Sequence, residues 1–176
     1  GQYLDLVFPT DYNLLERNYD GLLKYSIINN RPGQLRILLD FKQCTDPDLV
    51  TLAAERGHKE CLQLLLDAKC PMDETAIKWA AAFGHIECVD LLLDADCPID
   101  DYAIEWAVRH GQIACFKLLF DAGCPVDDCI ITCAAKYGQV ECLKLLIADG
   151  LPIYPEAIQF AKGNGHHECV ALLQEK

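Results

Sequence analysis

Residues 83–100 read FGHIECVDLLLDADCPID, and nearly the same line returns as HGQIACFKLLFDAGCPVD at 110–127 and as YGQVECLKLLIADGLPIY at 137–154. The glycine of this line recurs every 27 residues, at Gly57, Gly84, Gly111, Gly138 and Gly165. Upstream, ILLD at 37–40 keeps the same register, and Asn30 takes the glycine position. Gly and Asn are the residues that most often adopt the left-handed conformation that ends a helix. The column therefore predicts a helix end in every copy.

Each period predicts two short helices. The segment 73–83 begins with Asp73, a favoured N-cap residue, and places apolar residues at helical spacing before Gly84. The segment 85–95 repeats that spacing, and CPID follows as a turn. A pair this short cannot bury its apolar stripe alone, whereas stacked copies can. The sequence therefore predicts an all-α, helical-repeat solenoid of about six stacked helix-turn-helix units. The expected units span 19–45, 46–72, 73–99, 100–126, 127–153 and 154–176, and residues 1–18 are expected to form an N-terminal capping segment.

The line TAIKWAAAFGHIECVDLLLDADCPID at 75–100 resembles an ankyrin repeat. Its Ala-Ala, Gly-His and Leu-Leu-Leu elements stand in the family's order, and TAIKWA stands where the family writes T-P-L-H-x-A. The resemblance covers about 19–176 and implies a stack whose first helices line a concave surface. The ankyrin period is about 33 residues, and the missing residues fall after CPID, so we expect no β-hairpin finger there. This shorter form is similar to ankyrin arrays of amoebae, algae and their giant viruses.

Charge and motifs restrict the class of function. The net charge of −12 disfavours nucleic acid and anionic membrane surfaces, and no apolar run approaches the roughly 18 residues of a membrane span. We expect a monomeric array that binds a protein partner, with a basic partner favoured by the charge. We find no nucleophile motif, phosphate loop or HExxH motif, so we predict no enzymatic activity and no cofactor. Because the chain begins at Gly1, we expect a segment of a longer protein, and a targeting subunit of a larger enzyme remains an alternative.

Eleven cysteines are an odd number in a chain too large to need disulfides, which indicates reduced thiols in the cytoplasm or nucleus. Most stand in two columns, Cys61, Cys88, Cys115, Cys142 and Cys169, and Cys70, Cys97 and Cys124. Equivalent positions on packed helices lie roughly 8–10 Å apart, too far for a disulfide, so packing as small hydrophobic residues is favoured. A metal- or redox-responsive protein is the alternative. Cys129 and Cys133 are a weak zinc signal; we expect Cys129 to be exposed and Cys133, in the column of Trp79 and Trp106, to be buried. We predict no metal site.

Two further columns predict structural roles. The residue after the glycine is His or Gln, as in His85 and Gln112, and we expect it to tie helix ends to the neighbouring repeat. The column Asp46, Asp73, Asp100 and Asp127 predicts helix capping in preference to a carboxylate site.

Positions that differ between the copies predict the binding surface. The fifth position of each first helix is nearly always Ala, which indicates packing, whereas the third, seventh and eighth positions vary, and the third and seventh share one face. They hold the Arg and aromatic residues that interfaces favour. The predicted partner-binding residues on the concave face are Arg56, Lys78, Phe83, Glu105, Arg109, His110, Lys136 and Tyr137. The alternative is a solvated face, on which Glu105 and Arg109 form an ordinary ion pair. We therefore predict a non-enzymatic protein–protein interaction scaffold or adaptor.

Overall fold

A computed structural model describes residues 12–100 and 102–175 of the chain, and these residues form twelve helices and no strand. The helices are α1 (Tyr12–Ile28), α2 (Pro32–Phe41), α3 (Asp48–Glu55), α4 (Lys59–Asp67), α5 (Glu74–Phe83), α6 (Ile86–Asp94), α7 (Ala103–Arg109), α8 (Ile113–Asp121), α9 (Ile130–Lys136), α10 (Val140–Ala148), α11 (Pro155–Gly163) and α12 (His167–Gln174). The predicted all-α repeat solenoid is confirmed. In the expected capping segment 1–18, residues 1–11 lie outside the described residues, and α1 begins within the rest of it. The division into six units remains a prediction about repeat boundaries.

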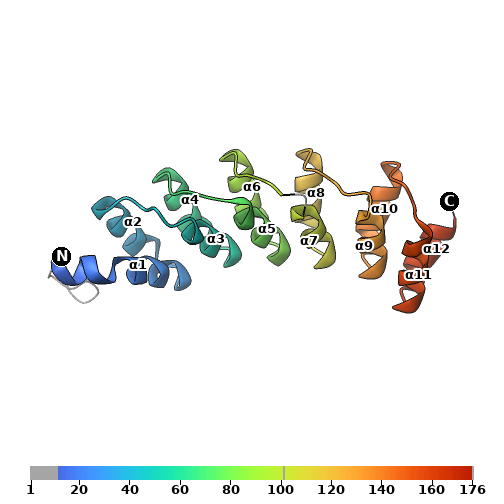
Figure 1. Ribbon diagram of the computed structural model, residues 1–176, viewed down its shortest axis with the longest axis horizontal. Coiled ribbons are helices and arrows are strands. Elements are labelled where there is room, and N and C mark those ends of the chain that lie inside the picture. Colours follow the sequence, from blue (N-terminus) through green and yellow to red (C-terminus); the bar gives the residue numbers. More distant parts are fainter. Residues whose placement is uncertain (1–11, 101, 176) are drawn as a thin grey trace.

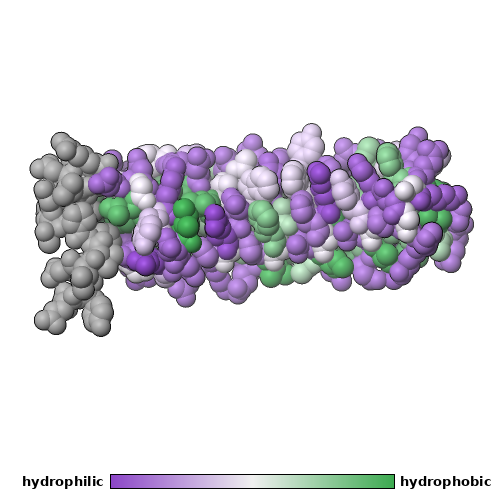
Figure 2. All heavy atoms as spheres, turned by 90° about the horizontal axis from the view of Figure 1, so that it is seen from below, coloured by the Kyte–Doolittle hydropathy of each residue, from purple (hydrophilic) through white to green (hydrophobic). Residues whose placement is uncertain are grey.

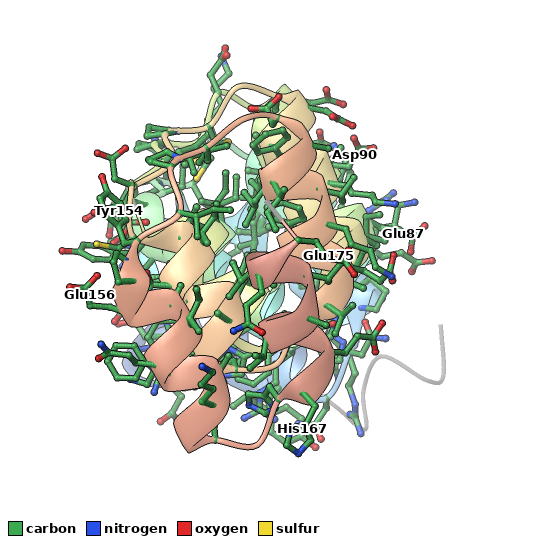
Figure 3. All side chains as sticks on the ribbon, turned by 90° about the vertical axis from the view of Figure 1, so that its right-hand side faces the viewer. Glu87, Asp90, Tyr154, Glu156, His167 and Glu175 are labelled. Carbon is green, nitrogen blue, oxygen red and sulfur yellow. The ribbon has the colours of Figure 1, made fainter. Side chains whose placement is uncertain are left out.

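The helices form two parallel rows (Figure 1). Odd-numbered helices pack against the next odd-numbered helix, and each also packs against the even-numbered helix that follows it in the chain. The whole array is gently bowed (Figure 1). Seen along the array from the C-terminal end, Tyr154 and Glu156 at the start of α11 lie on one flank, and Glu87 and Asp90 of α6 lie on the opposite flank (Figure 3). The molecule therefore has one flank built from odd-numbered helices and one built from even-numbered helices.

The predicted aspartate column precedes the first helices, and Asp73 is the N-cap residue of α5. The N-cap residues of α3, α7 and α9 are Pro47, Tyr102 and Cys129, one or two residues after the aspartate. Asp73 Oδ1 accepts the Thr75 backbone N–H at 3.0 Å. The column's other three members, Asp46, Asp100 and Asp127, accept the backbone N–H two residues further on in the same way. These carboxylates thus satisfy N–H groups that a helix start leaves without an intrahelical partner.

The glycine column has the left-handed conformation that the sequence predicts. Its φ values run from 68° at Gly57 to 78° at Gly84, and Asn30 in the same column has φ 48°. A second requirement acts on the column, because the side chain of the next repeat lies against the glycine. A Cβ atom at Gly57 would come within 2.4 Å of His85 Nδ1. Gly57, Gly84, Gly111 and Gly138 are therefore restricted both by backbone conformation and by contact, whereas nothing lies within 4 Å of a Cβ atom built at Gly165.

At two positions after the column glycine, His85 and His166, the side chain ties neighbouring repeats together, as predicted for this column. His85 Nε2 lies 3.0 Å from the Glu55 carbonyl oxygen, and His166 Nε2 lies 3.1 Å from the Lys136 carbonyl oxygen. Each carbonyl belongs to the end of the preceding repeat's first helix. The imidazole ring thus contacts a carbonyl group that has no hydrogen-bond partner within its own helix, because it lies at the helix C-terminus.

A second left-handed position follows the second helix of each pair, and there the sequence is freer. Lys69 has φ 54° and Asp96 has φ 53°, while Gly123 has φ 75°. Nothing lies within 4 Å of a Cβ atom built at Gly123. Comparison of the two turns shows that contact with the next repeat, added to a positive φ, is what restricts the glycine column.

One continuous hydrophobic core runs along the array between the two rows of helices. The near-constant alanine column is buried, and so are both cysteine columns. All eleven cysteines are free. Burial raises the pKa of Cys88, Cys97, Cys115 and Cys142 to about 11. The columns therefore contain neutral, packed thiols, in agreement with the packing interpretation.

Candidate functional site

A continuous row of aromatic and cationic side chains crosses the odd-numbered helices from α5 to α11. We name it the aromatic ladder. Its members are Trp79, Phe83, Trp106, Arg109, His110, Lys136, Tyr137 and Phe160.

Ring-to-ring contacts build the first half of the ladder. Trp79 stacks on Phe83 with ring centroids 5.8 Å apart, and Trp79 meets Trp106 at 5.2 Å. Trp106 then stacks on His110 at 5.3 Å. All three separations lie within the 4.5–7 Å range of favourable aromatic pairs. These contacts connect α5 to α7 along the surface of the array.

Cations over aromatic rings build the second half. The Arg109 guanidinium carbon lies 5.3 Å from the ring centroid of Trp106 and 5.3 Å from that of Tyr137. The Lys136 ammonium nitrogen lies 5.4 Å from the Tyr137 ring and 5.6 Å from the Phe160 ring. Cation–π contacts of this kind stabilise by about 0.5–1 kcal/mol each at exposed sites. Each cation bridges two repeats, so the ladder continues from α7 through α9 to α11.

The repeat and the helix period together position these residues. Phe83 follows Trp79 by four residues, and His110 follows Trp106 by four, which places each pair on one face of its helix. The same positions recur 27 residues later in the next helix of the row, so rings of successive repeats meet. Shared alanines beneath them let the helices approach closely.

Five of the eight predicted binding residues meet in the ladder: Phe83, Arg109, His110, Lys136 and Tyr137. The alternative pairing of Arg109 with Glu105 is not formed, since the described residues include no ion pair of either side chain and Arg109 lies over rings. Lys78 instead pairs with Asp100, with Nζ 3.8 Å from Oδ2. Arg56 is exposed at the end of α3 and makes no ring contact within the described chain.

Three members of the ladder, Trp79, Trp106 and Phe160, are not among the predicted binding residues. Trp79 and Trp106 are half-buried, and Phe160 is 44% exposed. These residues share one column, which lies four residues before the column of Phe83 and His110. Residues four apart lie on one face of a helix, so this spacing is the signal that could have identified them. A tryptophan at the edge of a packed helix can bury one face and still present the other.

A cavity of about 220 Å³ opens in the ladder beside Cys133, between Glu105 of α7, Lys136 and Tyr137 at the end of α9, and Phe160 of α11. The prediction that Cys133 is buried is wrong, because this thiol is half-buried at the cavity wall. Burial, with a smaller contribution from the Glu105 carboxylate, raises its pKa to about 12. Cys133 is therefore a neutral thiol.

Cys129 is exposed, as expected. Its N–H donates to Asp127 Oδ1 at 2.7 Å, and interaction with the Asp127 carboxylate raises the pKa of its thiol. Among the described residues, no group of three His, Cys, Asp or Glu side chains is arranged to hold a metal ion. The helices of residues 12–100 and 102–175 include none with the length and apolar character needed to span a bilayer.

The surface around the array is mixed. Seen from below, hydrophilic side chains cover most of the described surface, and hydrophobic side chains form separate patches between them (Figure 2). Phe83 at 49% and Phe160 at 44% exposure are among the large apolar side chains that face solvent. Exposed aromatic side chains next to cations are typical of interaction surfaces.

Comparisons with known proteins agree with this architecture. The family description "Ankyrin repeats (3 copies)" matches residues 23–103 and 50–129, which together cover more than half of the chain. The fold is similar to the human ASB11 ankyrin repeat domain, with a TM-score of 0.77 and 19% sequence identity over 87% of this chain and 82% of that one. A search of curated proteins gives no match. The family match, the two rows of short helices and the left-handed turns agree, and the chain belongs to the ankyrin repeat family.

Proposed function

We propose that this chain is a non-enzymatic scaffold or adaptor that binds a protein partner through the aromatic ladder on a concave face. Ankyrin repeats are generally protein–protein interaction modules without enzymatic activity. The observation that carries the proposal is the ladder itself. It places rings and cations at the surface over four successive odd-numbered helices, outside the columns that build the core.

Interface energetics support the ladder as the binding surface. A few Trp, Tyr and Arg residues usually account for most of the binding energy of an interface. Here Arg109 contacts both Trp106 and Tyr137 in the middle of the array. Neighbouring repeats lie on both sides of them, which limits the conformational freedom that binding would otherwise remove.

Charge supports a basic partner. The net charge is −12, and a chain this acidic attracts basic surfaces and repels nucleic acid and anionic membranes. The proposal includes a monomeric array in the cytoplasm or nucleus, where eleven free cysteines stay reduced.

The test is capture of partners from a reduced extract by the wild-type chain and by the triple variant Phe83→Ala, Arg109→Ala, Tyr137→Ala. We expect the variant to lose specific partners, since truncation of hot-spot residues costs about 1–3 kcal/mol or more of binding free energy. Far-UV circular dichroism at equal concentration checks that the variant is folded.

A matched variant on the opposite row of helices is the control. The triple variant Ile37→Ala, Ile86→Ala, Lys117→Ala also removes two large exposed apolar side chains and one cation, but it removes them from α2, α6 and α8. The control should retain the partners. Equal capture by all three proteins would show that the partner uses another surface.

A further inference from the structure

The cavity beside Cys133 lies where the aromatic ladder lacks a ring. Trp79, Trp106, Cys133 and Phe160 occupy equivalent positions at successive intervals of 27 residues. The first two rings touch each other at 5.2 Å. At the third position a small thiol replaces the ring, and the cavity of about 220 Å³ opens beside it, with Tyr137 and Phe160 in its lining. The gap is therefore a place for one flat group from another molecule.

The cavity walls combine apolar surface with negative charge. The side chains of Ile104 and Ile130 are buried and form part of its lining. Two carboxylates, Glu105 and Asp127, also line it, against the single cation Lys136. Lys136 is already engaged, because its ammonium lies over the Tyr137 and Phe160 rings.

Glu105 is the carboxylate without a partner. Asp127 accepts the Cys129 N–H, whereas the carboxylate of Glu105 makes no hydrogen bond or ion pair among the described side chains. Glu105 is half-buried at the wall. A half-buried carboxylate beside aromatic rings interacts more strongly with a cation than one in open water does. The charge of the walls is thus complementary to a cationic side chain.

We propose that this cavity binds an arginine side chain of the protein partner, with the guanidinium in the plane that the missing ring leaves open and paired with Glu105. The methylene stem would pack on the apolar wall beside Cys133. Arg109 already shows the chemistry within this ladder, because its guanidinium lies 5.3 Å from the Trp106 and Tyr137 ring centroids. The inference rests on the proposed function, because the arginine belongs to the partner.

Arginine suits the cavity better than lysine or a whole ligand does. A guanidinium is planar, stacks on rings and donates two parallel hydrogen bonds to a carboxylate, whereas an ammonium is a strongly hydrated point charge. The volume of about 220 Å³ is below the roughly 300–1,000 Å³ of sites for drug-sized molecules. The cavity is therefore large enough for one side chain but too small for a drug-sized molecule.

The experiment titrates the 15N-labelled chain with three capped tripeptides, Ac-Gly-Arg-Gly-NH2, its lysine analogue and its citrulline analogue. Citrulline keeps the shape of arginine and removes the charge. We expect the arginine peptide to cause saturable shifts of the Thr132, Cys133 and Phe160 amide signals, with a Kd of about 1–10 mM for a single side chain. The lysine and citrulline peptides should bind at least about fivefold more weakly, since each lacks either the planar fork or the charge.

Two variants locate the site. Glu105→Gln keeps the shape of the side chain and removes the charge, and we expect it to weaken the arginine peptide by about five- to tenfold. Asp90→Asn also removes one charge, but from α6 on the flank of the even-numbered helices (Figure 3), outside the lining of the cavity, and it should leave binding unchanged. Cys133→Phe restores the ring at this column position and should abolish the shifts. Should that variant fail to fold, Glu105→Gln still decides the question.

Three outcomes would overturn the inference. The lysine or citrulline peptide could bind with the same Kd as the arginine peptide, the arginine-induced shifts could persist unchanged in Glu105→Gln, or the arginine peptide could cause no saturable shift at concentrations up to several times the expected Kd. Failure of the proposed function is recognised separately. If Glu105→Gln captures the same proteins as wild type but the triple ladder variant loses them, only the arginine inference fails. If the triple ladder variant keeps every partner, the ladder is not the binding surface even where the peptide binds.

Discussion

Substitution of Gly57 by Ala separates the two restrictions on the glycine column. Gly57 has φ 68° and Gly123 has φ 75°, so an added methyl group meets similar backbone strain at both. At Gly57 the new Cβ would come within 2.4 Å of His85 Nδ1, whereas nothing lies within 4 Å at Gly123. Gly123→Ala is therefore the matched control for backbone conformation alone.

The expected magnitudes follow from these contacts. A left-handed conformation costs an L-residue roughly 1–2 kcal/mol, and the lower entropy of the unfolded alanine chain offsets about 0.4–1 kcal/mol. Gly123→Ala should thus cost about 1 kcal/mol. At Gly57 the His85 ring must move and weaken its bond to the Glu55 carbonyl oxygen, and overpacking of this kind adds about 1–3 kcal/mol. Gly57→Ala should thus cost about 2–4 kcal/mol.

Urea unfolding followed by circular dichroism measures both costs, with the slope compared between variants because repeat arrays can unfold in stages. The decisive measurement is a double-mutant cycle with His85→Ala. Without the imidazole, Gly57→Ala should cost no more than Gly123→Ala. Equal costs of the two glycine substitutions, or additivity of Gly57→Ala with His85→Ala, would refute the contact-based reasoning.

Three further results are expected. The buried cysteine columns should resist a thiol reagent in the native protein and react after denaturation, while Cys129 reacts at once; rapid native labelling of several columnar thiols, counted by mass spectrometry, would contradict their burial. Stability should fall as pH rises from 9 toward 11. Thiols such as Cys88 have a pKa near 9.0 in the unfolded chain but about 11 when folded, so the folded state holds more protons over this range. The free energy of unfolding should fall by about 2–3 kcal/mol per thiol, and urea unfolding that shows no change over this pH range would contradict the prediction. Glu74→Gln with Asp128→Asn should slow association with a basic partner and reduce its salt dependence. Binding kinetics at several ionic strengths measure this, and an effect confined to dissociation would argue against electrostatic steering.

The backbone of this protein was predictable because the repeat reports each structural requirement several times. Asn30 in the glycine column identifies a left-handed turn, since Gly and Asn share that conformation. The aspartate column and the alanine column likewise identify caps and core. Columns of this kind average over copies, so one unusual residue does not obscure the pattern.

The candidate site was only partly predictable, for the opposite reason. Its contacts join different columns in different repeats, as when Arg109 bridges Trp106 and Tyr137. Whether Arg109 pairs with Glu105 in its own helix or lies over a ring of the next depends on side-chain geometry between repeats. Periodicity alone also cannot show that the thiol of Cys133 leaves a cavity, because that depends on the rings that surround it.

The tie between each glycine turn and the side chain of the following repeat has a consequence for how arrays of this kind change length. Every such contact spans a single repeat, and the residue that contacts the glycine is of one of two kinds, His or Gln. Removal of residues 85–111 would therefore leave Gly84 facing Gln139 in place of Gln112, with no new type of contact. A chain built this way can gain or lose whole repeats by recombination and still fold, and each such event would lengthen or shorten the ladder by one step.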